Sequence, residues 1–185
     1  MQITPTSIPD VLIIQPQKHG DERGFFSEIF REDKLAEFGF TERFIQDNHA
    51  YSADPYVLRG LHFQSPPYAQ DKLLRVIKGS IYDVAVDIRK GSPTFGNWVG
   101  LELSAQNFKQ LLVPKGFAHG YLTLEPDTEV LYKVTNDYAP ESDKGLMWND
   151  SKIGIDWPLA GNEPQLSAKD KIQPSFEELP DFFKL

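Results

Sequence analysis

The feature that most constrains the fold is an alternation of apolar and polar side chains in many short segments. It is clearest in 80–89, where each even-numbered residue from Tyr82 to Ile88 is apolar and aspartate recurs between them. A period of two predicts a β-strand with one buried face. Many short strands at close spacing predict a sandwich or barrel. Comparable runs, bounded by glycine, proline, asparagine or aspartate, lie at 11–14, 25–30, 56–64, 72–77, 98–103, 108–113, 120–124 and 129–135.

Helical patterns are scarce. Residues 32–38 could form two helical turns ended by Gly39, and the tail between Pro174 and Pro180 could hold short turns. No repeat, low-complexity segment or linker divides the chain. We therefore predict an all-β fold with a few short peripheral helices, in one domain that spans residues 1–185.

Charge and residue types exclude several classes of function. Cysteine is absent, which excludes disulfides, thiolate nucleophiles and sulfur-ligated metals, so His, Asp and Glu must carry any chemistry. The formal net charge of −8 argues against binding to nucleic acid or to an anionic membrane. No apolar stretch approaches the roughly 20 residues of a membrane span. The first ten residues lack the pattern of a secretion signal, so we expect a cytoplasmic protein.

Two of the four histidines, His62 and His119, lie in strand-like sequence and are the candidate bases. Either could equally be a core histidine whose ring nitrogens are satisfied by its neighbours. Alternation places Lys72 on the face that carries Leu74 and Val76. If that face meets the one that carries His62, the cation disfavours the protonated imidazole and keeps the ring available as a base.

Tyr132 and Asp170 each have two interpretations. Tyr132 shares an inward face with Val130 and Val134, where its phenol could donate a proton or simply belong to an aromatic core. Asp170 follows Ser167 at the spacing of a helix-capping pattern, so a structural role is as well founded as a functional one.

Arg23 and Arg59 are the candidate residues for binding a diphosphate. The guanidinium group matches phosphate oxygens, and each of these arginines precedes a glycine that permits close backbone approach. Strict alternation puts Arg59 on the opposite face from His62. Both can therefore face one ligand only if Gly60 carries a bulge or the strand twists sharply there.

No metal or other cofactor is expected. β-Barrels often hold divalent ions through histidines and carboxylates, but Phe63 and Gln64 stand where a second close histidine would be needed. Lys72 would also place a positive charge beside the ion.

Several short motifs that span nearly the whole chain together carry a family likeness. They are Arg-Gly-Phe-Phe-Ser-Glu at 23–28, Gln-Asp-Asn at 46–48, Arg-Gly-Leu-His-Phe-Gln at 59–64, Lys72, Asp-Val-Ala-Val-Asp-Ile-Arg at 83–89, Gly-Phe-Ala-His-Gly at 116–120, Tyr132, Trp-Asn-Asp at 148–150 and Leu-Ser-Ala-Lys-Asp at 166–170. These motifs closely resemble those of the dTDP-4-dehydrorhamnose 3,5-epimerase family.

The resemblance implies a cupin-like jelly roll that forms a homodimer by exchanging N-terminal strands. It implies conversion of dTDP-4-dehydro-6-deoxy-D-glucose to dTDP-4-dehydro-L-rhamnose by proton exchange at C3 and C5, without a cofactor. His62 would be the base, polarised by Asp170, with Tyr132 as the acid and Lys72 stabilising the enolate. The nucleotide and sugar would be held by Arg23, Glu28, Gln46, Asp47, Asn48, Arg59, His119, Tyr138, Asp143 and Lys169.

Two assignments within the family pattern stay open at this point. Asp143 stands where the family commonly has glutamate, so either Asp143 or Glu141 could fill that role. Tyr138 is a second candidate for the acid, although Tyr132 has the better inward-facing strand position.

Three rival functions stay open as well. The chain could invert only one of the two carbons or act on another 4-keto sugar. It could be a non-catalytic barrel that binds sugars or nucleotides, although binding alone would not need an inward lysine beside a histidine and a tyrosine. A metal-dependent isomerase or oxygenase is the third alternative.

Overall fold

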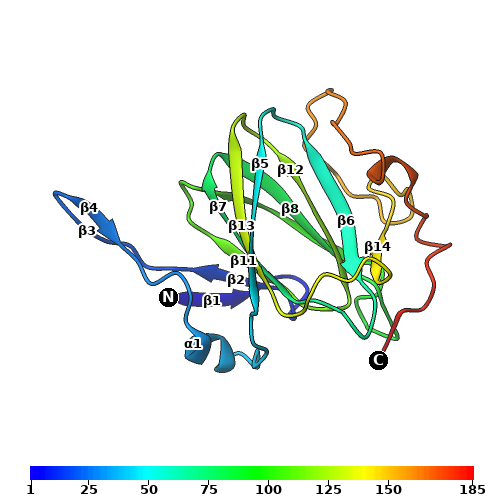
Figure 1. The fold of residues 1–185 in the computed structure, drawn as a ribbon, viewed down its shortest axis with the longest axis horizontal. Coiled ribbons are helices and arrows are strands. Elements are labelled where there is room, and N and C mark those ends of the chain that lie inside the picture. The colour runs from blue at the N-terminus through cyan, green and yellow to red at the C-terminus, as the bar shows by residue number, and fades with distance from the viewer.

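The computed structural model describes residues 1–185, and most of its regular structure is antiparallel strand (Figure 1). Its one α-helix covers five residues, and no helix is long enough to cross a membrane. The elements are β1 (Gln2–Pro5), β2 (Leu12–Gln15), β3 (His19–Asp21), β4 (Gly24–Phe26), α1 (Glu32–Ala36), β5 (Gln46–Ser52), β6 (Leu58–Gln64), β7 (Lys72–Lys78), β8 (Ser80–Asp87), β9 (Arg89–Lys90), β10 (Trp98–Ser104), β11 (Gln110–Val113), β12 (Phe117–Thr123), β13 (Thr128–Val134), β14 (Asp143–Gly145), the 3₁₀ helix η1 (Asp170–Ile172) and β15 (Phe183–Lys184).

Two antiparallel sheets pack face to face and form the body of the molecule. One has six strands in the order β1-β2-β11-β7-β13-β5, and the other has five in the order β10-β8-β12-β6-β14. Neighbouring strands such as β2 and β11 come from distant parts of the sequence, as the long connections of a jelly roll require. The predicted cupin-like jelly roll is confirmed.

Apolar side chains fill three layers rather than one, and one of these layers lies between α1 and the six-stranded sheet. The inward sides of both sheets meet in the central core, which includes Leu74 and Val130. The outer side of the five-stranded sheet is also buried, because Ile153, Trp157 and Phe176 of the C-terminal segment pack on it. In Figure 1 this segment, coloured orange to red, runs beside β6 and β14.

The prediction that β8 has one buried face is wrong. Asp83, Ala85 and Asp87 are fully buried, as are Val84 and Val86. The apolar row of β8 turns outward beneath the C-terminal segment, and its other row turns toward the central core. Alternation alone does not predict this, because a strand that is covered on both faces can bury its polar row as well as its apolar row.

The boundaries of several other elements differ from the predictions. The strand expected at 25–30 ends at Phe26, and the helix expected at 32–38 ends at Ala36. β1, β3, β5, β14 and β15 were not predicted. β5 was not predicted because its sequence, Gln-Asp-Asn-His-Ala-Tyr-Ser, shows little apolar alternation. The strand lies at an edge of its sheet.

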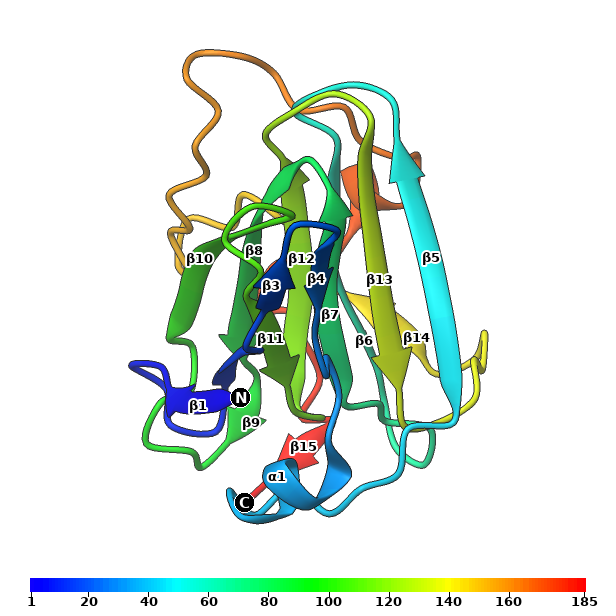
Figure 2. The same cartoon turned by 90° about the vertical axis from the view of Figure 1, so that its left-hand side faces the viewer.

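The β3–β4 hairpin projects from the body beside the outer side of the six-stranded sheet (Figures 1 and 2). On its second strand, 58% of Phe25 and 68% of Phe26 are exposed. Isolated two-stranded hairpins are marginally stable in water, so this arm requires further contacts to hold its shape.

A bulge at Gly60 interrupts the pairing of β6 with β12. His62 lies opposite His119 and Arg59 lies opposite Tyr121, so two residues of β6 face the single residue Gly120. Gly60 has φ +120°, and a Cβ atom there would lie 2.7 Å from the Gly120 Cα atom. Only glycine fits this crossing, and the extra residue turns Arg59 and His62 to the same side of the sheet.

Candidate functional site

A pocket of about 260 Å³ opens between the two sheets. The inward faces of five strands supply most of its wall, and the segment that leads into η1 supplies the rest. Its lining residues are Ala50, Arg59, His62, Lys72, Leu74, His119, Tyr121, Tyr132, Ser167 and Asp170. All four predicted catalytic residues are therefore brought together.

Asp170 orients the ring of His62. Its Oδ1 atom lies 2.5 Å from His62 Nε2, and Ser167 Oγ donates to its Oδ2 atom at 2.8 Å. Burial raises the pKa of Asp170, but the hydrogen bonds from His62 and Ser167 outweigh burial and hold the pKa below its usual value. The carboxylate accepts the Nε2 hydrogen, which leaves Nδ1 as the basic atom of a neutral ring.

Asp170 also forms a local turn with Ser167, although the N-cap of η1 is Lys169 and makes no side-chain capping hydrogen bond. The Asp170 backbone N–H donates to Ser167 Oγ at 3.1 Å. One carboxylate oxygen thus belongs to a local turn while the other contacts a histidine on β6. The turn itself fixes the position of the group that orients His62.

Lys72 extends from β7 toward β6, as the alternation predicted. Its Nζ atom donates to the carbonyl oxygen of His62 at 3.4 Å. Burial lowers the pKa of Lys72 to about 8, although the negative charges of Asp143 and Asp83 partly oppose this shift. A buried ammonium without a close carboxylate partner is available to an anion that enters the pocket.

Tyr132 lies on β13, in the sheet opposite the one that holds His62. Burial raises its pKa, and the nearby charge of Arg59 partly counteracts this effect. Its hydroxyl therefore keeps its proton at neutral pH. Tyr138 is outside the pocket and 61% exposed.

Arg59 and His119 occupy the side of the pocket formed by the five-stranded sheet. Arg59 Nη2 donates to the carbonyl oxygen of Tyr51 at 3.0 Å, and the bulge described above lets it share the pocket with His62. His119 Nε2 lies 2.9 Å from Asp83 Oδ1. The predicted conflict of faces between Arg59 and His62 is thereby resolved.

Asp143 and Lys169 form an ion pair on the β14 side of the site. Lys169 Nζ donates to Asp143 Oδ2 at 2.5 Å, and the Tyr138 hydroxyl donates to the same oxygen at 3.1 Å. β14 pairs with β6, and Asp143 lies opposite Gln64, two residues from His62. Glu141 is exposed, and only its backbone carbonyl makes a recorded contact, with Lys144. Of the two acidic candidates, Asp143 is the one joined to Lys169.

Gln46, Asp47 and Asn48 lie on β5 and point in alternate directions. Asn48 pairs with Tyr132, whereas Asp47 pairs with Lys133 and binds its Nζ atom at 2.8 Å on the other side of the sheet. Gln46 donates to Asn48 Oδ1 at 2.7 Å. Within one chain, Asp47 is therefore directed away from the pocket.

Arg23 and Glu28 do not line the pocket of their own chain. The Arg23 side chain is 83% exposed on the projecting hairpin and is paired with Asp21. Glu28 lies 3.3 Å from the Arg31 guanidinium group.

The sequence assigned no role to Tyr121, which lines the pocket, or to Asp83, which is fully buried and contacts the pocket residue His119. Asp83 was missed because the apolar row of β8 was assigned to the central core. Tyr121 was detectable, because it follows His119 by two residues and so shares its face of the strand.

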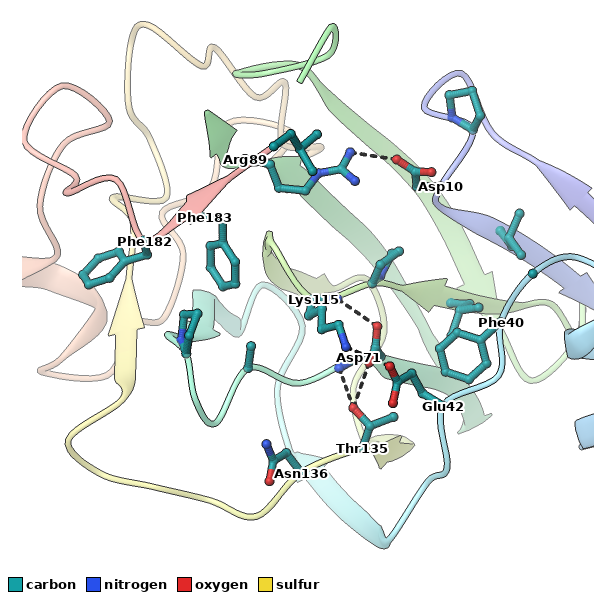
Figure 3. A pocket seen from close by; sticks show the side chains of 18 of the residues that line it. Asp10, Phe40, Glu42, Asp71, Arg89, Lys115, Thr135, Asn136, Phe182 and Phe183 are labelled. Carbon is teal, nitrogen blue, oxygen red and sulfur yellow. Dashed lines mark hydrogen bonds and ion pairs between the residues drawn. The ribbon is translucent and has the colours of Figure 1, made fainter. Parts of the chain in front are cut away.

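A larger hollow of about 770 Å³ shares no residue with this pocket (Figure 3). Its charged side chains already bind one another: Arg89 contacts Asp10 at 2.8 Å, and Lys115 contacts Glu42 at 2.9 Å. Asp71 accepts hydrogen bonds from Thr135 and from the Lys115 backbone. We therefore place the site between the sheets. No cluster of three or more His, Asp or Glu side chains is arranged to hold a metal ion.

Comparisons with known proteins identify the family of the chain. Residues 5–178 match the family model described as dTDP-4-dehydrorhamnose 3,5-epimerase. Proteins of that name from Salmonella typhimurium and Escherichia coli are 52% and 51% identical, and each alignment covers at least 96% of both chains.

Solved structures give the same result for the fold. An epimerase from Legionella pneumophila in complex with dTDP-4-keto-L-rhamnose superposes with a TM-score of 0.94 at 45% identity, covering 100% of this chain and 98% of the other. A 3'-monoepimerase from Streptomyces bikiniensis, in complex with dTDP-quinovose, has a TM-score of 0.86 at 32% identity, covering 94% and 87%. Sequence, fold and pocket together establish that this chain belongs to the dTDP-4-dehydrorhamnose 3,5-epimerase family.

Proposed function

We propose that the chain converts dTDP-4-dehydro-6-deoxy-D-glucose to dTDP-4-dehydro-L-rhamnose by inverting C3 and C5. The observation that carries this proposal is the position of three groups around one pocket: an oriented imidazole on one sheet, a protonated phenol on the opposite sheet and a buried ammonium. An epimerase needs a base and an acid on opposite sides of the sugar ring.

In each inversion His62 Nδ1 removes the hydrogen from a carbon beside the C4 ketone. The electron pair of that C–H bond forms a carbon–carbon double bond, and the carbonyl oxygen becomes an enolate. The positive charge of the Lys72 ammonium group stabilises the enolate oxygen. Tyr132 then protonates the carbon from the other side, and the ketone forms again. Proton exchange with solvent restores His62 and Tyr132 before the second carbon reacts.

The remaining residues hold the substrate in this proposal. Arg59 and His119 contact it within the pocket. Asn48 on β5 lies opposite Tyr132 on β13, and Gln46 donates a hydrogen bond to Asn48. Lys169, Asp143 and Tyr138 form the binding surface on the β14 side. The carbon acid is activated by its own ketone, so the reaction needs no electron acceptor.

The reaction in deuterated water tests this function. We expect the product to contain two solvent deuterons, one at C3 and one at C5, as measured by mass spectrometry and NMR. A single deuteron would support the narrower activity for which the Streptomyces bikiniensis relative is named. Substrate recovered without deuterium would reject an epimerase and favour a binding barrel.

We also propose a homodimer in which the hairpin arm of one subunit reaches the pocket of its partner. The exposure of Arg23, Phe25 and Phe26 on that arm supports this assembly. Tyr51 and Ile77 on the outer side of the six-stranded sheet are 53% and 37% exposed, which leaves an apolar surface for a second copy. A nucleotide-sugar substrate supports a location in the cytoplasm.

Mixing two inactive variants tests the exchange of arms. In a dimer of Arg23→Ala and His62→Ala subunits, one pocket keeps His62 and receives an intact Arg23 from its partner. An equal mixture should therefore regain about a quarter of the wild-type activity, because half of the dimers are mixed and each has one intact pocket. If Arg23 serves the pocket of its own subunit, mixing will restore nothing.

A further inference from the structure

The pocket contains a second histidine–aspartate pair beside the first. His119 Nε2 lies 2.9 Å from Asp83 Oδ1 and 3.1 Å from Asp83 Oδ2. His119 is 6% exposed and Asp83 is fully buried. His119 also lies directly opposite His62 in the pairing of β12 with β6. Two imidazoles, each held by its own carboxylate, are thus presented side by side.

Asp83 has few partners for a buried carboxylate. Its only side-chain hydrogen bonds are those with His119. Asp87, on the same strand and equally buried, binds Arg89, Ser92 and Thr94. Burying a carboxylate with so few donors is unfavourable for stability, so a role in folding does not account for Asp83. Its effect is on the histidine.

The free nitrogen of His119 is open to the pocket. Nδ1 makes no hydrogen bond within the chain. Only Ser27 Oγ and Gln173 Nε2 are buried side-chain atoms without a hydrogen-bond partner. Since Nδ1 of His119 also has no partner, it is not buried. Because Asp83 accepts the Nε2 hydrogen, Nδ1 of the neutral ring carries a lone pair and acts as a hydrogen-bond acceptor.

We propose that Asp83 is a positioning residue that fixes this tautomer, so that His119 accepts a hydrogen bond from a sugar hydroxyl. This inference rests on the proposed function. The ketone and the diphosphate have no hydrogen to donate, and they are matched by the donors Lys72 and Arg59. Two hydroxyls remain on a 4-keto-6-deoxyhexose, at C2 and C3. The C3 hydroxyl changes sides during the reaction, so the C2 hydroxyl is the one that a fixed acceptor can hold throughout.

The experiment compares Asp83→Asn with the wild type on two substrates: the 4-keto sugar nucleotide and its 2-deoxy analogue. An amide at this position can donate to Nε2 and favour the opposite tautomer, with the hydrogen on Nδ1. On the parent sugar, we expect kcat/KM of the variant to fall roughly 10- to 100-fold, the range for leaving a buried hydrogen-bonding group without its partner. On the 2-deoxy analogue, the fall should be less than about threefold, because the recognised hydroxyl is absent.

Two further measurements separate this role from a merely structural one. Nitrogen NMR of labelled histidines should show His119 with its hydrogen on Nε2 in the wild type and on Nδ1 in the variant. Asp71→Asn, a buried aspartate of the larger hollow, is the matched control and should retain wild-type kcat/KM on both sugars. If Asp83→Asn does not fold, Asp83→Leu, of similar volume, is compared instead.

Equal losses on the two sugars, or a wild-type His119 that carries its hydrogen on Nδ1, would overturn the inference. Failure of the proposed function has a different signature, because wild-type enzyme would then leave both sugars without deuterium. In that case the NMR measurement alone decides the tautomer.

Discussion

Replacing His62 with alanine is expected to slow the incorporation of solvent deuterium into the sugar by roughly 10²- to 10⁴-fold, the usual contribution of a positioned general base. The variant loses the ring nitrogen that Asp170 directs into the pocket. Incorporation at C3 and C5 would be followed by NMR. Both positions should slow together, because one base serves both carbons in the proposed mechanism.

Binding of dTDP is the control for the His62 variant. dTDP lacks the hexose that His62 contacts, so the affinity of the protein for dTDP should change less than about threefold. Asp170→Asn should have a smaller effect on exchange, because the amide can keep the ring in place but can present the wrong tautomer. Undiminished exchange in His62→Ala would show that the base is another residue.

Replacing Lys72 with methionine is expected to inactivate the protein and to stabilise it. Loss of the only buried ammonium should lower kcat by about 10²- to 10³-fold, as for other groups that stabilise an oxyanion. The pKa of Lys72 is about 8 in the fold, against an ordinary value of 10.5. This difference corresponds to roughly 3 kcal/mol, and solvent access through the open pocket reduces it to about 2 kcal/mol.

The pH dependence of the Lys72 effect has a definite sign. Because the folded state disfavours the charged lysine, the destabilisation is complete below about pH 8 and disappears as the pH rises toward 10.5. The advantage of Lys72→Met in urea unfolding should therefore be largest at pH 7 and vanish near pH 10.5. Wild-type activity should fall above about pH 8, as the ammonium loses its proton.

Lys115 offers a matched control for the lysine experiment. Its hydrogen bond with Glu42 raises its pKa, so its charge is favoured in the fold and Lys115→Met should bring no stabilisation. A Lys72→Met protein that is less stable than the wild type at pH 7, or that keeps its activity, would contradict the proposed role.

The sequence predicts the part of the site that follows regular alternation. Lys72 and Tyr132 were placed inward because their strands keep a strict period of two, and both line the pocket. Arg59 could be placed only conditionally, because alternation alone cannot show that Gly60 carries a bulge. The sequence left Asp170 as either a capping residue or a site residue, and in the fold it contacts His62 and forms a local turn with Ser167.

Some residues had no predicted role or point in another direction than predicted. Their positions are decided by contacts between distant segments of the chain. Asp83 was overlooked because burial of the outer row of β8 is decided by the C-terminal segment, more than 60 residues later in the chain. The direction of the Asp47 side chain could not be predicted for a similar reason. The motif at 46–48 locates the strand, but the pairing of β5 with β13 decides which of its side chains point inward.

The C-terminal segment joins the packing of one sheet to the geometry of the site. It covers the outer side of the five-stranded sheet with Trp157 and Phe176, and it also supplies Asp170 to His62. A ribosome-bound intermediate that ends before this segment has neither the cover nor the carboxylate. A chain cut before Ile153 would therefore expose the outer side of this sheet and leave His62 without the carboxylate that orients it.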